Sequence, residues 1–182
     1  MTRIFAALAL LAVAFMAATL LLGLSLGDIR VDRSLDTQRW ATVHRLSGIT
    51  AGFLVVLVNS IVVTYFIGTS RWVKEVVETY HLDPEFIRRS NSLKRRTFPW
   101  AVAAMLAVVG VVALGGAADP GAHPGSQQWV KPHLIGSILG LAFIAWASVA
   151  EWNNIYANHQ VIDGVMNDVR RVRQERGLDV EE

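Results

Sequence analysis

The chain has 182 residues, of which 53% are hydrophobic, and its mean hydropathy is +0.38. It has a net charge of only +2 and no cysteine, which excludes disulfides, thiolate metal sites and covalently attached c-type haem. The charged residues gather in blocks between apolar runs, as is typical of a membrane protein, and because topology explains the basic blocks we expect no nucleic-acid partner.

Four apolar runs are each close to the roughly 20 residues that a helix needs to cross the hydrocarbon core of a bilayer. They cover about residues 4–26, 44–67, 100–118 and 133–154. Each is predicted to be helical, because a lipid-exposed backbone must form its hydrogen bonds within its own segment. The first run follows Arg3, as in a signal peptide. It is too long for a secretory apolar region and lacks a small-residue cleavage site, so we interpret it as the first helix.

The sequence thus predicts an all-α integral membrane protein, a four-helix bundle in which residues 1–182 form a single domain in contact with the lipid bilayer. Lys and Arg are concentrated in the segment 68–99 and in the C-terminal tail, whereas the loop before the last span carries Lys131 alone. Because positively charged loops stay on the cytoplasmic side, we expect segment 68–99 and both termini to be cytoplasmic, in a bacterial inner membrane.

The cytoplasmic parts are predicted to be helical extensions of the bundle. Residues 83–85 (Asp-Pro-Glu) have the order of an N-cap, a first-turn proline and an acidic first turn, typical of a short helix ending in the basic run. A C-terminal helix is predicted over residues 155–182. Valines recur there at helical spacing, at Val161, Val165, Val169 and Val172. This apolar stripe needs a partner, which is either the segment 68–99 or another protein.

Two stretches of the chain indicate an internal repeat. Thr37–His44 (TQRWATVH) and Ser126–His133 (SQQWVKPH) share a glutamine, a tryptophan and a histidine at equivalent positions. Each places its histidine at the start of an apolar run, after a helix and a loop. We therefore interpret the bundle as two tandem helical hairpins related by an axis along the membrane normal. Trp40 and Trp129 are expected at the outer membrane interface.

His44 and His133 are the candidate metal ligands. An ionisable side chain inside a membrane span is costly and indicates a functional site by default, and two at equivalent depth indicate one shared ligand. A haem iron needs only two imidazoles and an apolar slot, whereas zinc and copper require more ligands. The sequence therefore predicts haem b with these two histidines as axial ligands. The alternative is a pair of interfacial side chains hydrogen-bonded to water or lipid headgroups.

Glycines follow each histidine on or near its own helix face. They are Gly48 and Gly52 after His44, and Gly136 and Gly140 after His133. A porphyrin between helices needs backbone free of side chains beside its ligands, so these glycines are candidate haem contacts. The alternative is that small residues at this spacing let membrane helices pack closely.

Polar residues toward the inner ends of the second and fourth spans also have two interpretations. They are Asn59, Thr64 and Tyr65 in the second span, and Glu151, Asn153 and Asn154 in the fourth. Either they line a quinone or proton-access pocket, or they form hydrogen bonds between helices and the cytoplasmic helix ends.

A four-helix bundle with histidines near the outer ends of helices two and four, here His44-Arg45 and His133-Leu134, resembles one half of the heme A synthase family. The resemblance covers about residues 4–157 and implies haem ligation by both histidines. In the catalytic half of that family a glutamate lies three residues before the first histidine. Here that position is Ala41, so the resemblance implies haem binding without synthase activity.

The segment VHRLSG also resembles the His-Arg-x-Ser/Thr-Gly motif of the cytochrome b membrane subunit of succinate dehydrogenase. In that family the motif lies near the quinone site. That family has three core helices, one fewer than this chain is expected to have.

Two functions therefore remain open. The first is a b-type cytochrome-like membrane protein that holds one haem near the outer face, for electron transfer or haem handling, with a quinone or a redox protein as partner. The second is a non-catalytic membrane subunit or assembly factor without cofactor, which docks a protein partner through its C-terminal helix. The sequence does not decide whether the chain is an enzyme.

Overall fold

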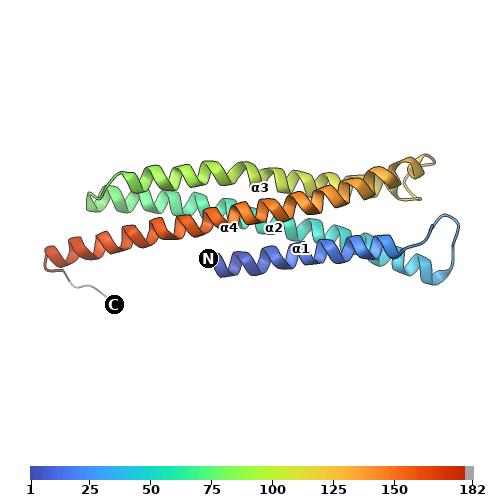
Figure 1. Ribbon diagram of the computed structural model, residues 1–182, viewed down its shortest axis with the longest axis horizontal. Coiled ribbons are helices and arrows are strands. Elements are labelled where there is room, and N and C mark those ends of the chain that lie inside the picture. The colour runs from blue at the N-terminus through green and yellow to red at the C-terminus, as the bar shows by residue number, and fades with distance from the viewer. Residues whose placement is uncertain (179–182) are drawn as a thin grey trace.

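The computed structural model describes residues 1–178, which form four long helices and one short 3-10 helix. They are α1 (Thr2–Ser25), α2 (Leu35–Tyr80), α3 (Glu85–Ala118), η1 (Ser126–Trp129) and α4 (Val130–Glu175). The long helices lie side by side in an elongated bundle (Figure 1). No strand occurs within the described residues, so the predicted all-α fold is confirmed.

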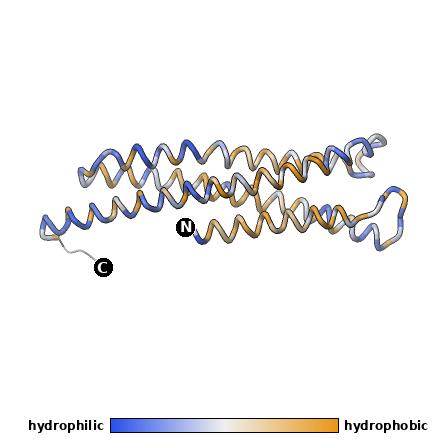
Figure 2. Tube along the Cα trace, viewed as in Figure 1, coloured by the Kyte–Doolittle hydropathy of each residue, from blue (hydrophilic) through white to orange (hydrophobic). Residues whose placement is uncertain are grey.

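All four long helices are apolar and long enough to cross a membrane, which is consistent with an integral membrane protein. Apolar residues are concentrated in the part of the bundle that contains α1, and hydrophilic residues at its two ends (Figure 2). Large hydrophobic side chains are exposed on the outside of that part, among them Leu10, Phe53, Leu106 and Leu139. So large an apolar surface is rare in soluble monomers, and lipid would cover it.

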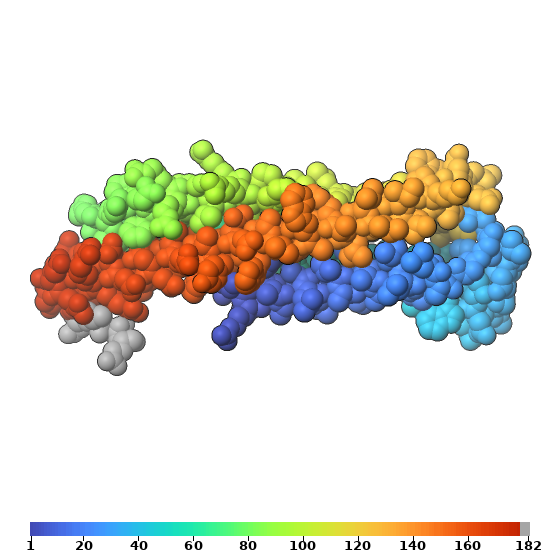
Figure 3. Space-filling view, viewed as in Figure 1, coloured from blue at the N-terminus to red at the C-terminus, as the bar shows by residue number. Residues whose placement is uncertain are grey.

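The bundle has two different ends, which we name for their residues. The histidine end carries the loops 26–34 and 119–125 and the first turns of α2 and α4. The basic end carries the turn 81–84 and the last turns of α4. Because α1 begins partway along the bundle, four helices pack together near the histidine end. Only α2, α3 and α4 continue to the basic end, as a three-helix extension (Figures 1 and 3).

The parts predicted as helical extensions of the bundle are continuous with the predicted spans. Segment 68–99 comprises the rest of α2, the turn 81–84 and the first part of α3, and Pro99 lies within α3. α4 likewise continues through residue 155 without a break, and residues 179–182 of the predicted C-terminal helix lie outside the described part of the chain. Charges mark where an apolar run ends, but the helical hydrogen bonds continue past that point because they do not depend on the solvent.

Local signals set the helix ends. α2 begins after Ser34, whose hydroxyl accepts a hydrogen bond from the N–H of Thr37 at 3.3 Å. It ends at His81, which adopts a left-handed conformation with φ 55°. The carboxylate of Asp83 then accepts a hydrogen bond from the N–H of Glu85, the first residue of α3, at 2.8 Å, but the N-cap position is occupied by Pro84 and not by Asp83 as predicted. These residues reverse the chain between α2 and α3.

The valine stripe of α4 is covered by the chain itself. Val161, Val165 and Val169 are buried against residues of α2 and of the turn after it, including Val73 and Leu82. The segment 68–99 is therefore the partner of this stripe, as one of the two alternatives predicted. The contact closes a hydrophobic core inside the three-helix extension, separate from the larger core near α1.

A layer of polar side chains lies between the two cores. Asn158, which is fully buried, donates to Tyr65 Oη at 3.2 Å and to Thr69 Oγ1 at 3.0 Å. Its Oδ1 accepts a hydrogen bond from Ser90 Oγ at 3.3 Å, and the hydroxyls of Ser90 and Ser70 lie 3.3 Å apart. Tyr65 therefore forms a hydrogen bond between helices, which was one of its two predicted interpretations.

Candidate functional site

The structure brings His44 and His133 together at the histidine end. Their ring centroids lie 6.4 Å apart and their ring planes cross at 68°. His44 lies on α2 and His133 on α4, and both side chains are half-buried. The two histidines that the sequence places at equivalent positions are thus neighbours in space.

Each imidazole lies against a glycine of the preceding helix. A Cβ at Gly23 of α1 would lie 2.6 Å from Cε1 of His44, and a Cβ at Gly115 of α3 would lie 3.0 Å from Cε1 of His133. Real Cβ atoms make essentially no contact as close as the first, and few as close as the second. A hydrogen in place of a methyl group at these two positions is therefore what allows the rings to occupy their places.

The ring nitrogens next to these glycines face backbone carbonyls. His44 Nδ1 lies 3.2 Å from the carbonyl oxygen of Thr19, one helical turn before Gly23. The carbonyl of Val111, one turn before Gly115, acts on the ring of His133 from the corresponding position of α3. Its geometry is less regular, since His133 Nδ1 makes no hydrogen bond within normal limits. A protonated Nδ1 of His44 would therefore point at a carbonyl.

This orientation decides which nitrogen is available to a ligand. A neutral imidazole carries its hydrogen on one nitrogen and a lone pair on the other. If Nδ1–H of His44 donates to the carbonyl, Nε2 keeps the lone pair. A carbonyl that fixes the tautomer through the far nitrogen is the usual support of a metal-bound histidine.

The spacing of the rings suits a single metal atom between them. Histidine–metal bonds of about 2 Å on each side would hold two ring centres roughly 6 Å apart. No group of three or more His, Cys, Asp or Glu side chains that could hold a metal occurs within residues 1–178. The donor set is thus two imidazoles, which suffice for a haem iron because the porphyrin supplies the other four ligands.

The four glycines proposed from the sequence lie at contacts between helices. Added Cβ atoms at Gly52, Gly136 and Gly140 would approach side chains of α3 at 3.2, 2.8 and 2.7 Å, and one at Gly48 would lie 4.0 Å from Thr19 Cγ2 of α1. These positions fit the close-packing alternative. Their contact with a haem stays a prediction.

Sequence reasoning missed the two glycines that do touch the imidazoles. Gly23 and Gly115 lie near the ends of the first and third apolar runs, so a glycine in the last turns of both runs was the available signal. The loops that follow them differ in length, and the two glycines are therefore not at the offset that relates the histidines.

Two arginines link the loops at the histidine end. Arg45, directly after His44, forms a 2.7 Å ion pair with Asp119 at the end of α3. Arg30 donates to the carbonyl of Ala118 at 2.8 Å and to Ser126 Oγ at 3.0 Å. Because the last carbonyls of a helix carry partial negative charge, cations are favourable there. The links join the loop after α1 and the start of α2 to the end of α3 and to η1.

Comparison of the chain with protein-family models, with curated proteins and with solved structures gives no match. Function therefore has to be inferred from the residues of this chain.

Proposed function

We propose that this chain is a b-type cytochrome-like membrane protein that binds one haem between His44 and His133. The observation that carries the proposal is the 6.4 Å separation of the two ring centroids, which matches two imidazoles sharing one metal atom. Ionisable side chains within membrane spans indicate a functional site by default, and these two lie together.

The surroundings of the rings support the same conclusion. Thr19 presents a carbonyl to Nδ1 of His44, and Gly23 leaves room for the ring beside it. Gly115 leaves room for the ring of His133 in the same way, although Nδ1 of His133 makes no hydrogen bond. This equivalence also supports the proposed arrangement of the bundle as two tandem hairpins. In each hairpin, a glycine of the first helix would make room for the histidine of the second helix.

The length of the apolar part suits a bilayer placed between the histidines and the polar layer. From His44 to Tyr65 the helix rises about 30 Å at 1.5 Å per residue, which is close to the thickness of a hydrocarbon core. In this proposal the histidine end faces outward, and the three-helix extension with its many arginines lies in the cytoplasm.

When bound, the haem would supply one-electron chemistry, and the chain would fix its position. The residues of the chain orient the two imidazoles through the Thr19 carbonyl and through the contacts at Gly23 and Gly115. Ala41, three residues before His44, is buried and has no acid function. Electron transfer or haem handling, with a quinone or a redox protein as partner, is therefore favoured over oxidation of the haem itself.

The experiment is an absorbance spectrum of the protein purified in detergent from haem-replete cells. We expect a low-spin b-type spectrum, which sharpens on reduction, with one haem per chain. A colourless protein that also fails to take up added haem would contradict the proposal. It would favour the second function, a membrane subunit or assembly factor without cofactor.

A further inference from the structure

A second unusual position lies in the larger core, far from the histidines. Glu151 on α4 is only 1% exposed, and its Oε1 has no hydrogen-bond partner. Asn59 on α2 is 3% exposed, and its Oδ1 has none either, although its Nδ2 donates to the Val55 carbonyl at 2.8 Å. Buried polar atoms are nearly always paired, so two unpaired acceptors in one core need an explanation.

The register of the helices places these two side chains at nearby levels. Asn158 bonds to Thr69 across 89 residues, and His44 and His133 have the same separation, so α2 and α4 keep one register along the bundle. In that register Glu151 lies level with Val62, three residues from Asn59. Three residues of helix rise only about 4.5 Å.

Both side chains are buried among residues of the larger core. On α4 the residues one turn before and after Glu151, Ala147 and Ile155, belong to the larger core, and on α2 so do Val55 and Val62 around Asn59. Thr97 of α3 is fully buried and lies level with Glu151, as judged from the Ser90–Asn158 hydrogen bond between the same two helices. Its hydroxyl already donates to the Leu93 carbonyl.

Within residues 1–178 no ion pair or hydrogen bond to Glu151 is present, and Lys94, the half-buried cation of the adjoining part of α3, makes none with it. The other cations of the adjoining helix segments, Arg3 on α1 and Arg95 and Arg96 on α3, are exposed to the outside of the bundle. Tyr65 is the titratable side chain of α2 in this region, and its hydroxyl oxygen is bonded to Asn158. An ionised carboxylate without a partner is strongly disfavoured in such a core, because nothing compensates for the loss of its hydration.

We propose that Glu151 is a proton-binding site of the bundle, occupied in the resting protein, whose O–H donates to the free Oδ1 of Asn59. Both oxygens are acceptors, so they cannot bond to each other until one carries a hydrogen. Binding one proton forms the O–H bond and removes the charge. A single step thus satisfies both unpaired atoms.

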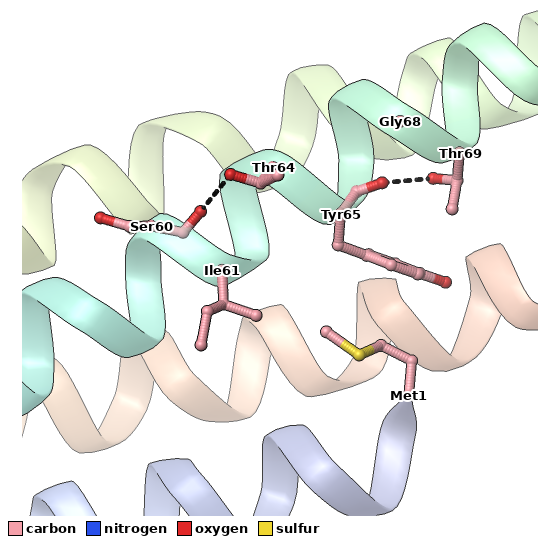
Figure 4. A pocket seen from close by; sticks show the side chains of 7 residues that line it. All are labelled: Met1, Ser60, Ile61, Thr64, Tyr65, Gly68 and Thr69. Atoms are coloured by element: carbon pink, nitrogen blue, oxygen red, sulfur yellow. Dashed lines mark hydrogen bonds between the residues drawn. The ribbon is translucent and has the colours of Figure 1, made fainter.

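The proton of Glu151 would exchange with solvent on the side of the basic end. A cavity of about 530 Å³ lies beside α2, lined by Met1 and by Ser60, Thr64, Tyr65 and Thr69 among others (Figure 4). The oxygen of Tyr65 accepts from Asn158, which leaves its hydroxyl hydrogen free. Asn158 is two helical turns from Glu151 on α4, about 10 Å, whereas His133 is about 27 Å away.

The test is infrared spectroscopy of the purified full-length protein in lipid. We expect a C=O stretching band of a protonated carboxyl at neutral pH. It should disappear in Glu151→Gln, and in Asn59→Leu it should move to higher frequency because the hydrogen bond is lost. Glu78→Gln, which changes an exposed carboxylate in the extension, should leave the band unchanged.

The wild-type protein gives a second measurement that needs no variant. Its band should shift in heavy water and fade as the pH is raised. A wild-type spectrum without a protonated-carboxyl band, or a band unaffected by Glu151→Gln, would overturn the proposal. A band that appears only when sodium is removed would also overturn it, since the oxygens would then bind a metal cation instead of a proton.

Discussion

Gly23 lies so close to His44 that a Cβ at the glycine would come within 2.6 Å of the ring carbon Cε1. Gly115 and His133 repeat the arrangement on the other pair of helices, with a corresponding distance of 3.0 Å. In both cases the preceding helix determines where the imidazole on the next helix can lie. The position of the rings thus depends on two glycines, which have no side chain that could itself bind a ligand.

Gly23→Ala is expected to displace the ring of His44 and weaken haem binding. Relieving such a contact costs about 1–3 kcal/mol in a packed interior, which corresponds to a loss of affinity of roughly fivefold or more. The measurement is haem titration of the purified apoprotein, followed by absorbance. Gly115→Ala should have a smaller effect of the same kind, because its contact is longer.

Gly116→Ala is the matched control for these variants. A Cβ at Gly116 meets nothing within 4 Å, although the residue is next to Gly115 in the same helix. Its haem affinity should equal that of the wild type. Equal affinities for all three variants would show that the glycines do not position the ligands.

Removing either histidine should abolish the low-spin spectrum. One imidazole supplies one axial bond, so His44→Ala or His133→Ala would leave a five-coordinate haem or none. His159→Ala is the control, because that side chain is half-exposed near Asp163 at the other end of the bundle. A low-spin spectrum that survives either of the first two substitutions would identify other ligands.

The sequence was sufficient to predict the helices, because apolar runs of this length have few alternatives in lipid. It also predicted that His44 and His133 would meet, since a constant offset relates the two stretches that contain them. It did not reveal that Gly23 and Gly115 make room for the two imidazoles. The loops between each glycine and its histidine differ in length, so the glycines are not related by the offset that relates the histidines. Nor could it show that Glu151 lies in the core, because a glutamate beside Trp152 near a span end is equally typical of an interface.

The three-helix extension should depend on its buried valines. Val165→Ala removes apolar volume from a fully buried position and is expected to destabilise the extension by about 2 kcal/mol. The readout is faster hydrogen exchange in residues 68–80 and 85–92, with unchanged exchange near the histidines. Met166→Ala, at the exposed neighbouring position, should have little effect. Equal exchange in both variants would mean that the valine core does not hold the extension together.

Asp119 should contribute a pH-dependent stabilisation at the histidine end. Partial burial raises its pKa, but the hydrogen bond from Arg45, a backbone N–H and the charges of Arg45 and Arg30 outweigh burial and lower it below the ordinary 3.8. Because the folded-state pKa is the lower one, the stabilisation is complete above 3.8. It is lost as the pH falls through the folded-state value.

Thermal unfolding of Asp119→Asn in detergent measures this effect. At neutral pH we expect a loss of at most about 1 kcal/mol, because both partners are partly exposed and solvent screens the pair. In strong acid the variant and the wild type should become equal. Asp36→Asn, whose carboxylate is 85% exposed beside Arg39, is expected to change nothing at either pH. A difference that persists in acid would assign the effect of Asp119 to packing instead of charge.

The proposed orientation can be tested with single cysteines, because the chain contains none of its own. Ser92 lies exposed in the extension and Gly121 lies exposed in a loop at the histidine end. The many Lys and Arg of segment 68–99 are expected to keep the extension in the cytoplasm. A membrane-impermeant maleimide should therefore label Gly121→Cys in intact cells, and Ser92→Cys only after lysis. Labelling of Ser92→Cys alone would reverse the orientation, and labelling of both in intact cells would be incompatible with a bundle that crosses the membrane between these two residues.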